Sequence, residues 1–242
     1  MKSLALMLKT LTMRIAILSD IHEDHSRLKR VLKKIEKKGC DLTVCLGDIS
    51  GFSPSYYRYP KTRNASTCLE LIRKKCEIII PGNHDLHAAG LIPILPADAG
   101  YEYWKHEEDL DPGYSEEEIA FLADLPKYAI LPTPDLNILL SHYLEPNLSG
   151  IIQGFYWSGK EFGAHFQLMK EFSCKIAFTG HAHARGFHLT NPQQFEQYGY
   201  RQLRLKDFPV VIGIPPVTRN NMRSGFCIFD TDSFLLQVTK LY

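Results

Sequence analysis

Five separate segments of the chain end in side chains that can bind a metal ion. Each segment is a short apolar run, and the polar side chains follow it directly: Asp20 and His22, Asp48, Asn83 and His84, His142, and His181 with His183. Aspartates supply anionic oxygens, neutral histidines supply nitrogens, and an asparagine carbonyl adds a ligand without adding charge. This mixed set suits Mn²⁺, Fe or Zn²⁺, and the lack of a cysteine partner argues against a structural zinc site.

The candidate ligands are too numerous for one ion. They are Asp20, His22, Asp48, Asn83, His142, His181 and His183. Two divalent ions that share one carboxylate would use all of them, at the separation of about 3.5–4 Å typical of two-metal phosphoryl sites. His181 and His183 are two residues apart, so an extended backbone would direct both to the same side. Taken alone, however, such an H-x-H pair also fits an ordinary polar loop.

Alternating strand and helix patterns predict how these groups are positioned. Apolar, β-branched runs predict strands at 14–18, 42–46, 77–80, 136–140, 175–178, 210–214, 226–229 and 235–241. Apolar spacing predicts helices over 25–38 and 65–75, and S-x-x-E capping boxes at 115–118 and 158–161 predict two further helix starts. The alternation indicates an α/β fold, in which ligands bind outside the carboxyl ends of the strands. The closely spaced strands after residue 210 predict an antiparallel or mixed portion.

Composition sets the broad class of the protein. The chain has 242 residues, 45% of them hydrophobic, which predicts one domain over 1–242. Residues 1–12 are expected to be a short N-terminal extension, and the irregular segment 88–115 either a loop or cap near the site or a plain surface insertion. A net charge of +1 provides no global attraction to nucleic acid or to a membrane. Six cysteines without a C-x-x-C pair, and no apolar run of membrane-spanning length or signal-peptide pattern, predict a cytoplasmic location.

The motifs together resemble those of the calcineurin-like metallophosphoesterase family. They are D-x-H at 20–22, G-D-x-x-G at 47–51, G-N-H-D at 82–85, a lone histidine at 142 and G-H-x-H at 180–183, in this order. The resemblance implies a four-layer α/β/β/α sandwich with two mixed sheets. It also implies that Asp20, His22 and His183 hold one metal ion, that Asn83, His142 and His181 hold the second, and that Asp48 bridges them. His84 would bind no metal and would act on the phosphoryl group.

The implied chemistry is hydrolysis of phosphoester bonds. Two divalent cations, with Mn²⁺ or Fe favoured and Zn²⁺ a further candidate, lower the pKa of a shared water so that hydroxide attacks phosphorus. His84 would donate a proton to the leaving oxygen or stabilise its charge. We expect a phosphatase or phosphodiesterase that acts on a small phosphorylated substrate, with a nucleotide as one candidate. A metal-dependent nuclease, which should carry a basic groove, and a non-catalytic interaction scaffold are the alternatives; all eight site positions are retained, which argues against the scaffold.

Departures from the family pattern narrow the expected type of phosphoesterase. Ser/Thr protein phosphatases carry G-D-x-x-D-R-G, whereas here Gly51 and Phe52 stand where that second aspartate and arginine would be. The residue that orients His84 is therefore left open, and Asp85 is adjacent only in sequence. The stretch 47–60 and the helices around it instead resemble small bacterial phosphodiesterases and diadenosine-tetraphosphatase-like members. Glu23 and Asp24 replace the G-N of that branch. We expect them to cap the following helix, and the alternative is that their negative charge disfavours highly anionic substrates.

Overall fold

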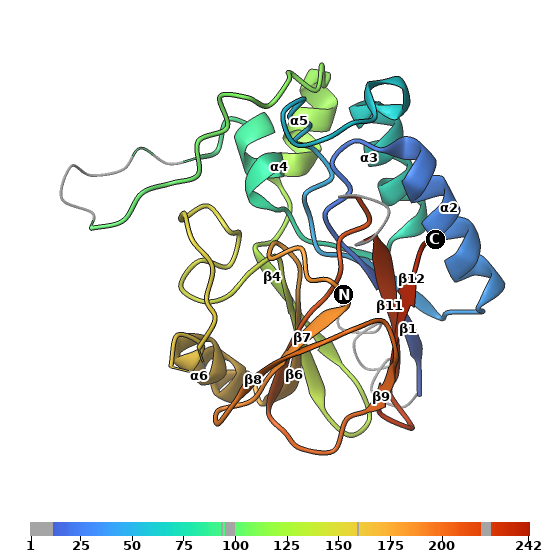
Figure 1. The fold of residues 1–242 in the computed structure, drawn as a ribbon, viewed down its shortest axis with the longest axis vertical. Helices are drawn as coiled ribbons and strands as arrows, with labels where there is room; N and C mark the ends of the chain where they lie inside the picture. Colours follow the sequence, from blue (N-terminus) through green and yellow to red (C-terminus); the bar gives the residue numbers. More distant parts are fainter. Residues whose placement is uncertain (1–11, 93, 95–99, 159, 219–223) are drawn as a thin grey trace.

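Two six-stranded mixed sheets lie face to face in the computed structural model, which describes residues 12–92, 94, 100–158, 160–218 and 224–242 (Figure 1). The first sheet has the order β3 (Ile78–Ile79), β2 (Leu42–Cys45), β1 (Arg14–Leu18), β11 (Gly225–Asp230), β12 (Leu235–Lys240), β9 (Gln202–Arg204). The second has the order β4 (Tyr128–Pro132), β5 (Asn137–Ser141), β6 (Cys174–Thr179), β10 (Val210–Gly213), β7 (Phe187–Thr190), β8 (Phe195–Tyr198). In each sheet parallel pairs, such as β1 with β2 and β5 with β6, adjoin antiparallel ones.

Helices cover the outer face of each sheet. On the first sheet lie α2 (His25–Lys37), α3 (Ala65–Lys75) and α5 (Glu116–Ala123), whereas α6 (Gly163–Glu171) packs on the second (Figure 1). A short α4 (Asn83–Ala88) and a 3₁₀ turn, η1 (Pro60–Thr62), complete the helical elements of the described residues. The architecture is thus the predicted four-layer α/β/β/α sandwich.

Side-chain alternation along the strands explains the layers. In β1, Ile15 and Ile17 enter the core between the sheets, whereas Ala16 and Leu18 pack against the helices. Successive residues of a strand point to opposite faces, so a strand covered on both sides must be apolar throughout. This is why the sequence shows continuous apolar runs here, and why polar groups begin where the strands end.

Most predicted elements are confirmed, with one wrong helix start. Ser115 caps α5 through Glu118 as expected, but α6 begins at Gly163 and has no side-chain cap. Ser158 and Glu161 do form hydrogen bonds with each other, yet they close a turn that precedes the helix. Strands β4, β7, β8 and β9 were not predicted. Most of the expected extension 1–12 lies outside the described residues, and in the described part no helix is long and apolar enough to span a membrane.

Candidate metal centre

The carboxyl ends of strands from both sheets meet at one edge of the sandwich. Backbone hydrogen bonds join the loops there: the Asp20 N–H donates to the Gly47 carbonyl at 2.9 Å, and the Gly180 N–H donates to the His142 carbonyl at 2.9 Å. The His181 N–H donates to Oδ1 of Asp20 at 3.1 Å and so links the two sheets. The structure therefore brings together all five of the segments singled out in the sequence.

One cluster contains Asp20, His22 and His183. Their ligand atoms lie within 4.8 Å of one another, and Nε2 of His183 is 3.2 Å from Oδ1 of Asp20. Nδ1 of His22 lies 2.9 Å from the Gly51 carbonyl and must donate to it, because a carbonyl only accepts. Nε2 of the neutral His22 ring is then an acceptor, and Nε2 of His183 lies 3.1 Å from it and donates to it when that nitrogen carries the proton.

A second cluster contains Asp48, His142 and His181, again with ligand atoms within 4.8 Å. Nδ1 of His142 donates to the Leu46 carbonyl at 2.6 Å, and its Nε2 lies 3.3 Å from Oδ2 of Asp48 without hydrogen-bond geometry. Oδ1 of Asn83 is 3.1 Å from Nδ1 of His181. Asp48 also groups with His22 and His84, so it lies between the two clusters.

The hydrogen-bond inventory fits a pair of cations. Nδ1–H of His142 is committed to the Leu46 carbonyl, so its Nε2 faces Oδ2 of Asp48 and needs a second proton or a cation there. Oδ2 of Asp20 and Nε2 of His181 are buried without a partner. Backbone carbonyls hold Nδ1–H of His22 and His142, the usual way in which a protein orients a metal-binding imidazole.

Burial and charge set the protonation states of these groups. Burial lowers the pKa of both His22 and His181 to about 3, which keeps them neutral, as metal ligands must be. Burial alone would raise the pKa of Asp20, but the neighbouring His183 and His142 lower it to about 2. Burial likewise lowers the pKa of His142, but Asp48 and Asp20 outweigh it and raise the pKa to about 9, so in the absence of a cation this ring carries a proton beside Asp48. The clusters thus offer carboxylates together with the neutral imidazoles of His22 and His181.

The backbone at these positions is unusual. Eight non-glycine residues of the described chain have positive φ, and five of them are predicted ligands: Asp20, His22, Asp48, His181 and His183. L-residues other than asparagine, aspartate and histidine rarely adopt this conformation, and strained backbone concentrates at functional sites. The sharp turn after each strand directs the next side chain into the shared volume.

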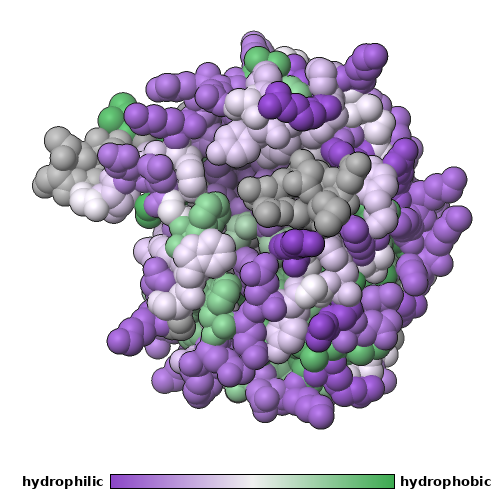
Figure 2. All heavy atoms as spheres, viewed as in Figure 1, coloured by the Kyte–Doolittle hydropathy of each residue, from purple (hydrophilic) through white to green (hydrophobic). Residues whose placement is uncertain are grey.

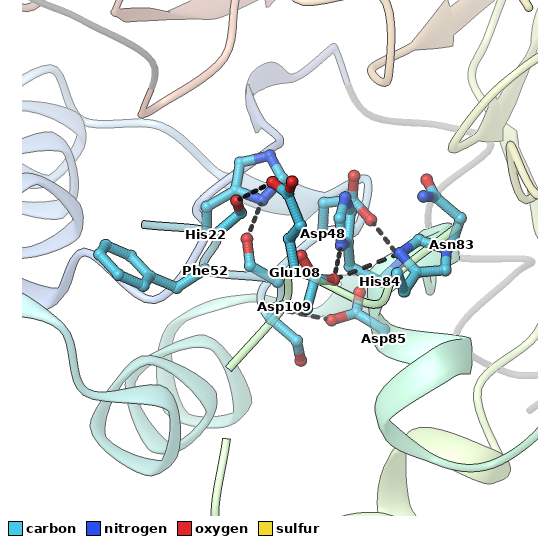
Figure 3. Close-up of polar contacts among 12 residues, drawn as sticks. His22, Asp48, Phe52, Asn83, His84, Asp85, Glu108 and Asp109 are labelled. Carbon is cyan, nitrogen blue, oxygen red and sulfur yellow. Dashed lines mark hydrogen bonds and ion pairs between the residues drawn. The ribbon is translucent and has the colours of Figure 1, made fainter. Parts of the chain in front are cut away.

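His84 begins the short helix α4 and contacts the clusters without completing either. Its backbone N–H donates to Oδ1 of Asp48 at 3.1 Å, and its Nδ1 lies 2.5 Å from Oδ2 of Asp109 (Figure 3). Burial lowers the pKa of His84, but Asp48 and Asp109 outweigh it and raise the pKa to about 9. His84 is therefore a charged imidazolium at neutral pH, a state that can donate a proton.

Comparison with known proteins decides the family. A model of the calcineurin-like phosphoesterases matches residues 13–185, which is most of the chain. The chain belongs to the calcineurin-like phosphoesterase family. Membership makes it a phosphoesterase, a hydrolase of phosphoester bonds.

Individual relatives of this phosphoesterase are distant. An uncharacterised protein of Methanocaldococcus jannaschii is 37% identical over 76 residues, which span 31% of this chain and 28% of that protein. A metallophosphoesterase of Sphaerobacter thermophilus has a TM-score of 0.70 at 21% identity and covers 95% of this chain and 88% of its own. A hypothetical protein of Pyrococcus horikoshii has a TM-score of 0.62 at 15% identity, and the match covers 94% of this chain and 87% of that protein. A protein proposed to be a diadenosine tetraphosphatase has a TM-score of 0.53 at 15% identity, and the match covers 96% of this chain and 95% of that protein. At these identities the structural matches show the shared fold.

Sequence reasoning missed the residues that contact His84 in the phosphoesterase. Asp109 and His106 lie in the irregular segment 88–115, and no sequence motif includes either residue. The signal available was the dense polar run H-E-E-D at 106–109. Asp85 does not contact the His84 ring; it accepts hydrogen bonds from the backbone N–H groups of Gly82, Ile49 and Ser50.

The two acids after the first motif have different roles. Asp24 caps α2 as expected, since its side chain accepts from the Arg27 N–H. Glu23 does not cap the helix: it is fully buried, pairs with Arg63 at 2.5 Å, and accepts from the backbone N–H groups of Gly51 and Phe52. The extra negative charge at Glu23 is thus compensated by Arg63 inside the fold.

A cavity of about 1560 Å³ opens over the clusters and His84. Polar and charged residues make up most of the lining, and the face of the molecule shown in Figure 2 is also mainly hydrophilic. Tyr57 stacks on His22 at 4.8 Å on one side. On the other side Phe155 and Trp104 lie 5.3 and 6.2 Å from His181 by ring centroids, and Trp157 continues this wall. The volume exceeds what a phosphate group alone needs.

Proposed function

We propose that the phosphoesterase is a two-metal hydrolase that acts on a small phosphorylated substrate. One divalent ion would be held by Asp20, His22 and His183. The other ion would be held by Asn83, His142 and His181, and Asp48 would bind both ions. The observation that carries this proposal is the position of Asp48 between two clusters in which Oδ2 of Asp20 and Nε2 of His181 are buried without a partner. Mn²⁺ or Fe is our first choice for the ions and Zn²⁺ the next.

Some of these side chains would bind the metal ions, and His84 would transfer a proton. The ions, when bound, lower the pKa of a water and polarise the phosphoryl oxygens. His84 lies beside the bridging Asp48 but has its Nδ1 committed to Asp109, which leaves Nε2 for the substrate. As an imidazolium, His84 would donate the Nε2 proton to the departing oxygen.

The cavity favours a small substrate with a planar or apolar substituent. Trp104, Phe155 and Trp157 form an aromatic wall next to the second cluster, and Trp157 is 52% exposed. An exposed tryptophan beside a phosphoryl site suits stacking of a base or another aromatic group, so a nucleotide is our leading candidate. The charged residues around the cavity are of both signs: Arg27, Arg58, Lys105 and Arg185 against Glu102, Glu107, Glu108 and Asp109. That balance argues against the basic groove of a nuclease.

Two further expectations are part of the same proposal. The inter-sheet core takes residues from Met13 to Val238, which fits one domain over the whole chain. All six cysteines are free thiols, which fits a reducing compartment such as the cytoplasm.

A hydrolysis panel tests the function. The protein, loaded with Mn²⁺, is offered p-nitrophenyl phosphate, bis-p-nitrophenyl phosphate, cyclic nucleotides and dinucleoside polyphosphates. We expect hydrolysis of at least one class, loss of activity with a chelator, and two equivalents of metal by elemental analysis. An inactive protein that binds two ions would favour the scaffold, whereas cleavage confined to DNA or RNA would favour the nuclease.

A further inference from the structure

In the Ser/Thr phosphatases of this family an aspartate stands at the position of Gly51. Here the space that a side chain at residue 51 would need is occupied by the His84 ring. Gly51 occupies that sequence position with φ of +88°, and a Cβ built on it would lie 2.2 Å from Nδ1 of His84. No side chain can stand at residue 51 while the imidazole keeps this place. An acid that orients His84 must therefore come from elsewhere in the chain.

Asp109 supplies a carboxylate at that ring. Its Oδ2 is 2.5 Å from Nδ1 of His84 and 3.2 Å from Nδ1 of His106, so one oxygen receives two imidazole N–H groups. The His106 ring packs edge-on against His84 at 4.6 Å and is buried. The acid and its second histidine thus hold the His84 ring in one orientation, with Nδ1–H donated to the carboxylate.

The segment that carries Asp109 is fastened to the loop that carries Gly51. The Leu110 N–H donates to the Phe52 carbonyl at 2.9 Å, and the Glu108 carboxylate accepts from the hydroxyls of Ser53 and Ser55.

Arg63 provides a second fastening between the two. It donates to the carbonyls of Leu110 and Asp111 while it pairs with Glu23. Glu23 in turn accepts from the N–H groups of Gly51 and Phe52. The buried Glu23 and the half-buried Arg63 thus fix both the loop that carries Gly51 and the segment that carries Asp109.

We infer that Asp109, delivered by the 88–115 segment, is the positioning residue for His84 and replaces the acid that Gly51 excludes. The inference rests on the proposed role of His84 as proton donor. Asp109 does not touch the substrate; it keeps Nδ1–H of His84 engaged so that Nε2 faces the leaving oxygen. The 88–115 segment is then part of the catalytic apparatus and not a surface insertion.

The test compares leaving groups. With Mn²⁺ bound, Asp109→Ala should lower kcat by roughly 10²-fold on phenyl phosphate esters with poor leaving groups, because a displaced catalytic group costs about that much. A p-nitrophenyl ester, whose leaving group needs little protonation, should be nearly unaffected, and KM should change little for either. Asp111→Ala, which removes an exposed carboxylate from the same segment, is the matched control and should behave as wild type.

A double-mutant cycle and a spectroscopic measurement complete the test. Asp109→Ala should have almost no further effect in a His84→Ala background, since residues that act as one unit are not additive. In the metal-free protein, ¹⁵N NMR of the histidine rings should show loss of the Nδ1–H hydrogen bond of His84 to the carboxylate in Asp109→Ala. Equal losses for both leaving groups, additive losses in the cycle, or an unchanged His84 ring would each overturn the inference. An inactive wild type would refute the proposed function instead, and the NMR result would still decide the role of Asp109.

Discussion

Substitution of the shared carboxylate tests the metal centre most directly. Asp48 groups with ligands of both clusters, whereas Asp20 belongs to one. At a metal concentration 100 times the dissociation constant, each occupied site stabilises the fold by about 2.7 kcal/mol, so two sites contribute about 5 kcal/mol. For a chain of this length that corresponds to a rise in Tm of about 10–20 °C.

We expect Asp20→Asn to keep about half of that rise and one equivalent of metal. Asp48→Asn should lose most of the rise and hold less than one equivalent, because both ions lose a ligand. Thermal unfolding with and without Mn²⁺ measures the shift within each variant, which cancels the effect of the substitution on the metal-free protein. Elemental analysis after gel filtration gives the stoichiometry. Two full equivalents and an undiminished rise in Asp48→Asn would refute the bridging role.

Three other predictions address catalysis, packing and pH. His84→Ala should cut turnover by roughly 10²- to 10⁴-fold with metal content unchanged; equal activity would remove His84 from the mechanism. Gly82→Ala would place a Cβ 2.1 Å from Oδ1 of Asp48 and should lower metal content and Tm, whereas Gly163→Ala, with open space around it, should do neither. Burial lowers the pKa of His165 to about 3, so its contribution to stability is complete above pH 6.5 and falls as the unfolded chain takes up the proton below it. Between pH 6.5 and 4.5 this costs about 2–3 kcal/mol, and His165→Gln should reduce the loss in urea unfolding by that amount; an unchanged pH profile would contradict the assignment.

Much of this architecture was readable from the sequence because burial leaves a strong signal. Strands such as β1 and β6 lie between two layers, and a strand covered on both faces is apolar throughout. The polar residues after them, Asp20 and His181, then mark the strand ends. The metal-binding roles of these residues stay predictions, although the structure places them together.

Other parts of the structure had no comparable signal. Strands β8 and β9 are partly exposed and mix charged with apolar residues, so local pattern did not reveal them. Strand β7 is mostly buried, but it is only four residues long and shows no clear apolar run, because His188 and Thr190 interrupt it. The Ser158–Glu161 pair matches a capping box, yet those side chains bond to each other in a turn and α6 starts later. Asp109 was missed because its contact with His84 spans 25 residues and depends on how an irregular segment folds back.

The left-handed backbone at the site ties stability to metal binding. Each non-glycine residue in this conformation costs roughly 1–2 kcal/mol, so the five predicted ligands together cost about 5–10 kcal/mol, toward the lower end because aspartate and histidine tolerate it best. That is comparable with the whole stability of a typical domain. The unpartnered Oδ2 of Asp20 and Nε2 of His181 add to this cost when no cation is bound. Strand burial and the pair of the buried Glu23 with the half-buried Arg63 must therefore hold the turns in place, and bound cations would satisfy these atoms. The metal-dependent rise in Tm should accordingly be large in the wild type and smallest where the bridging carboxylate is gone.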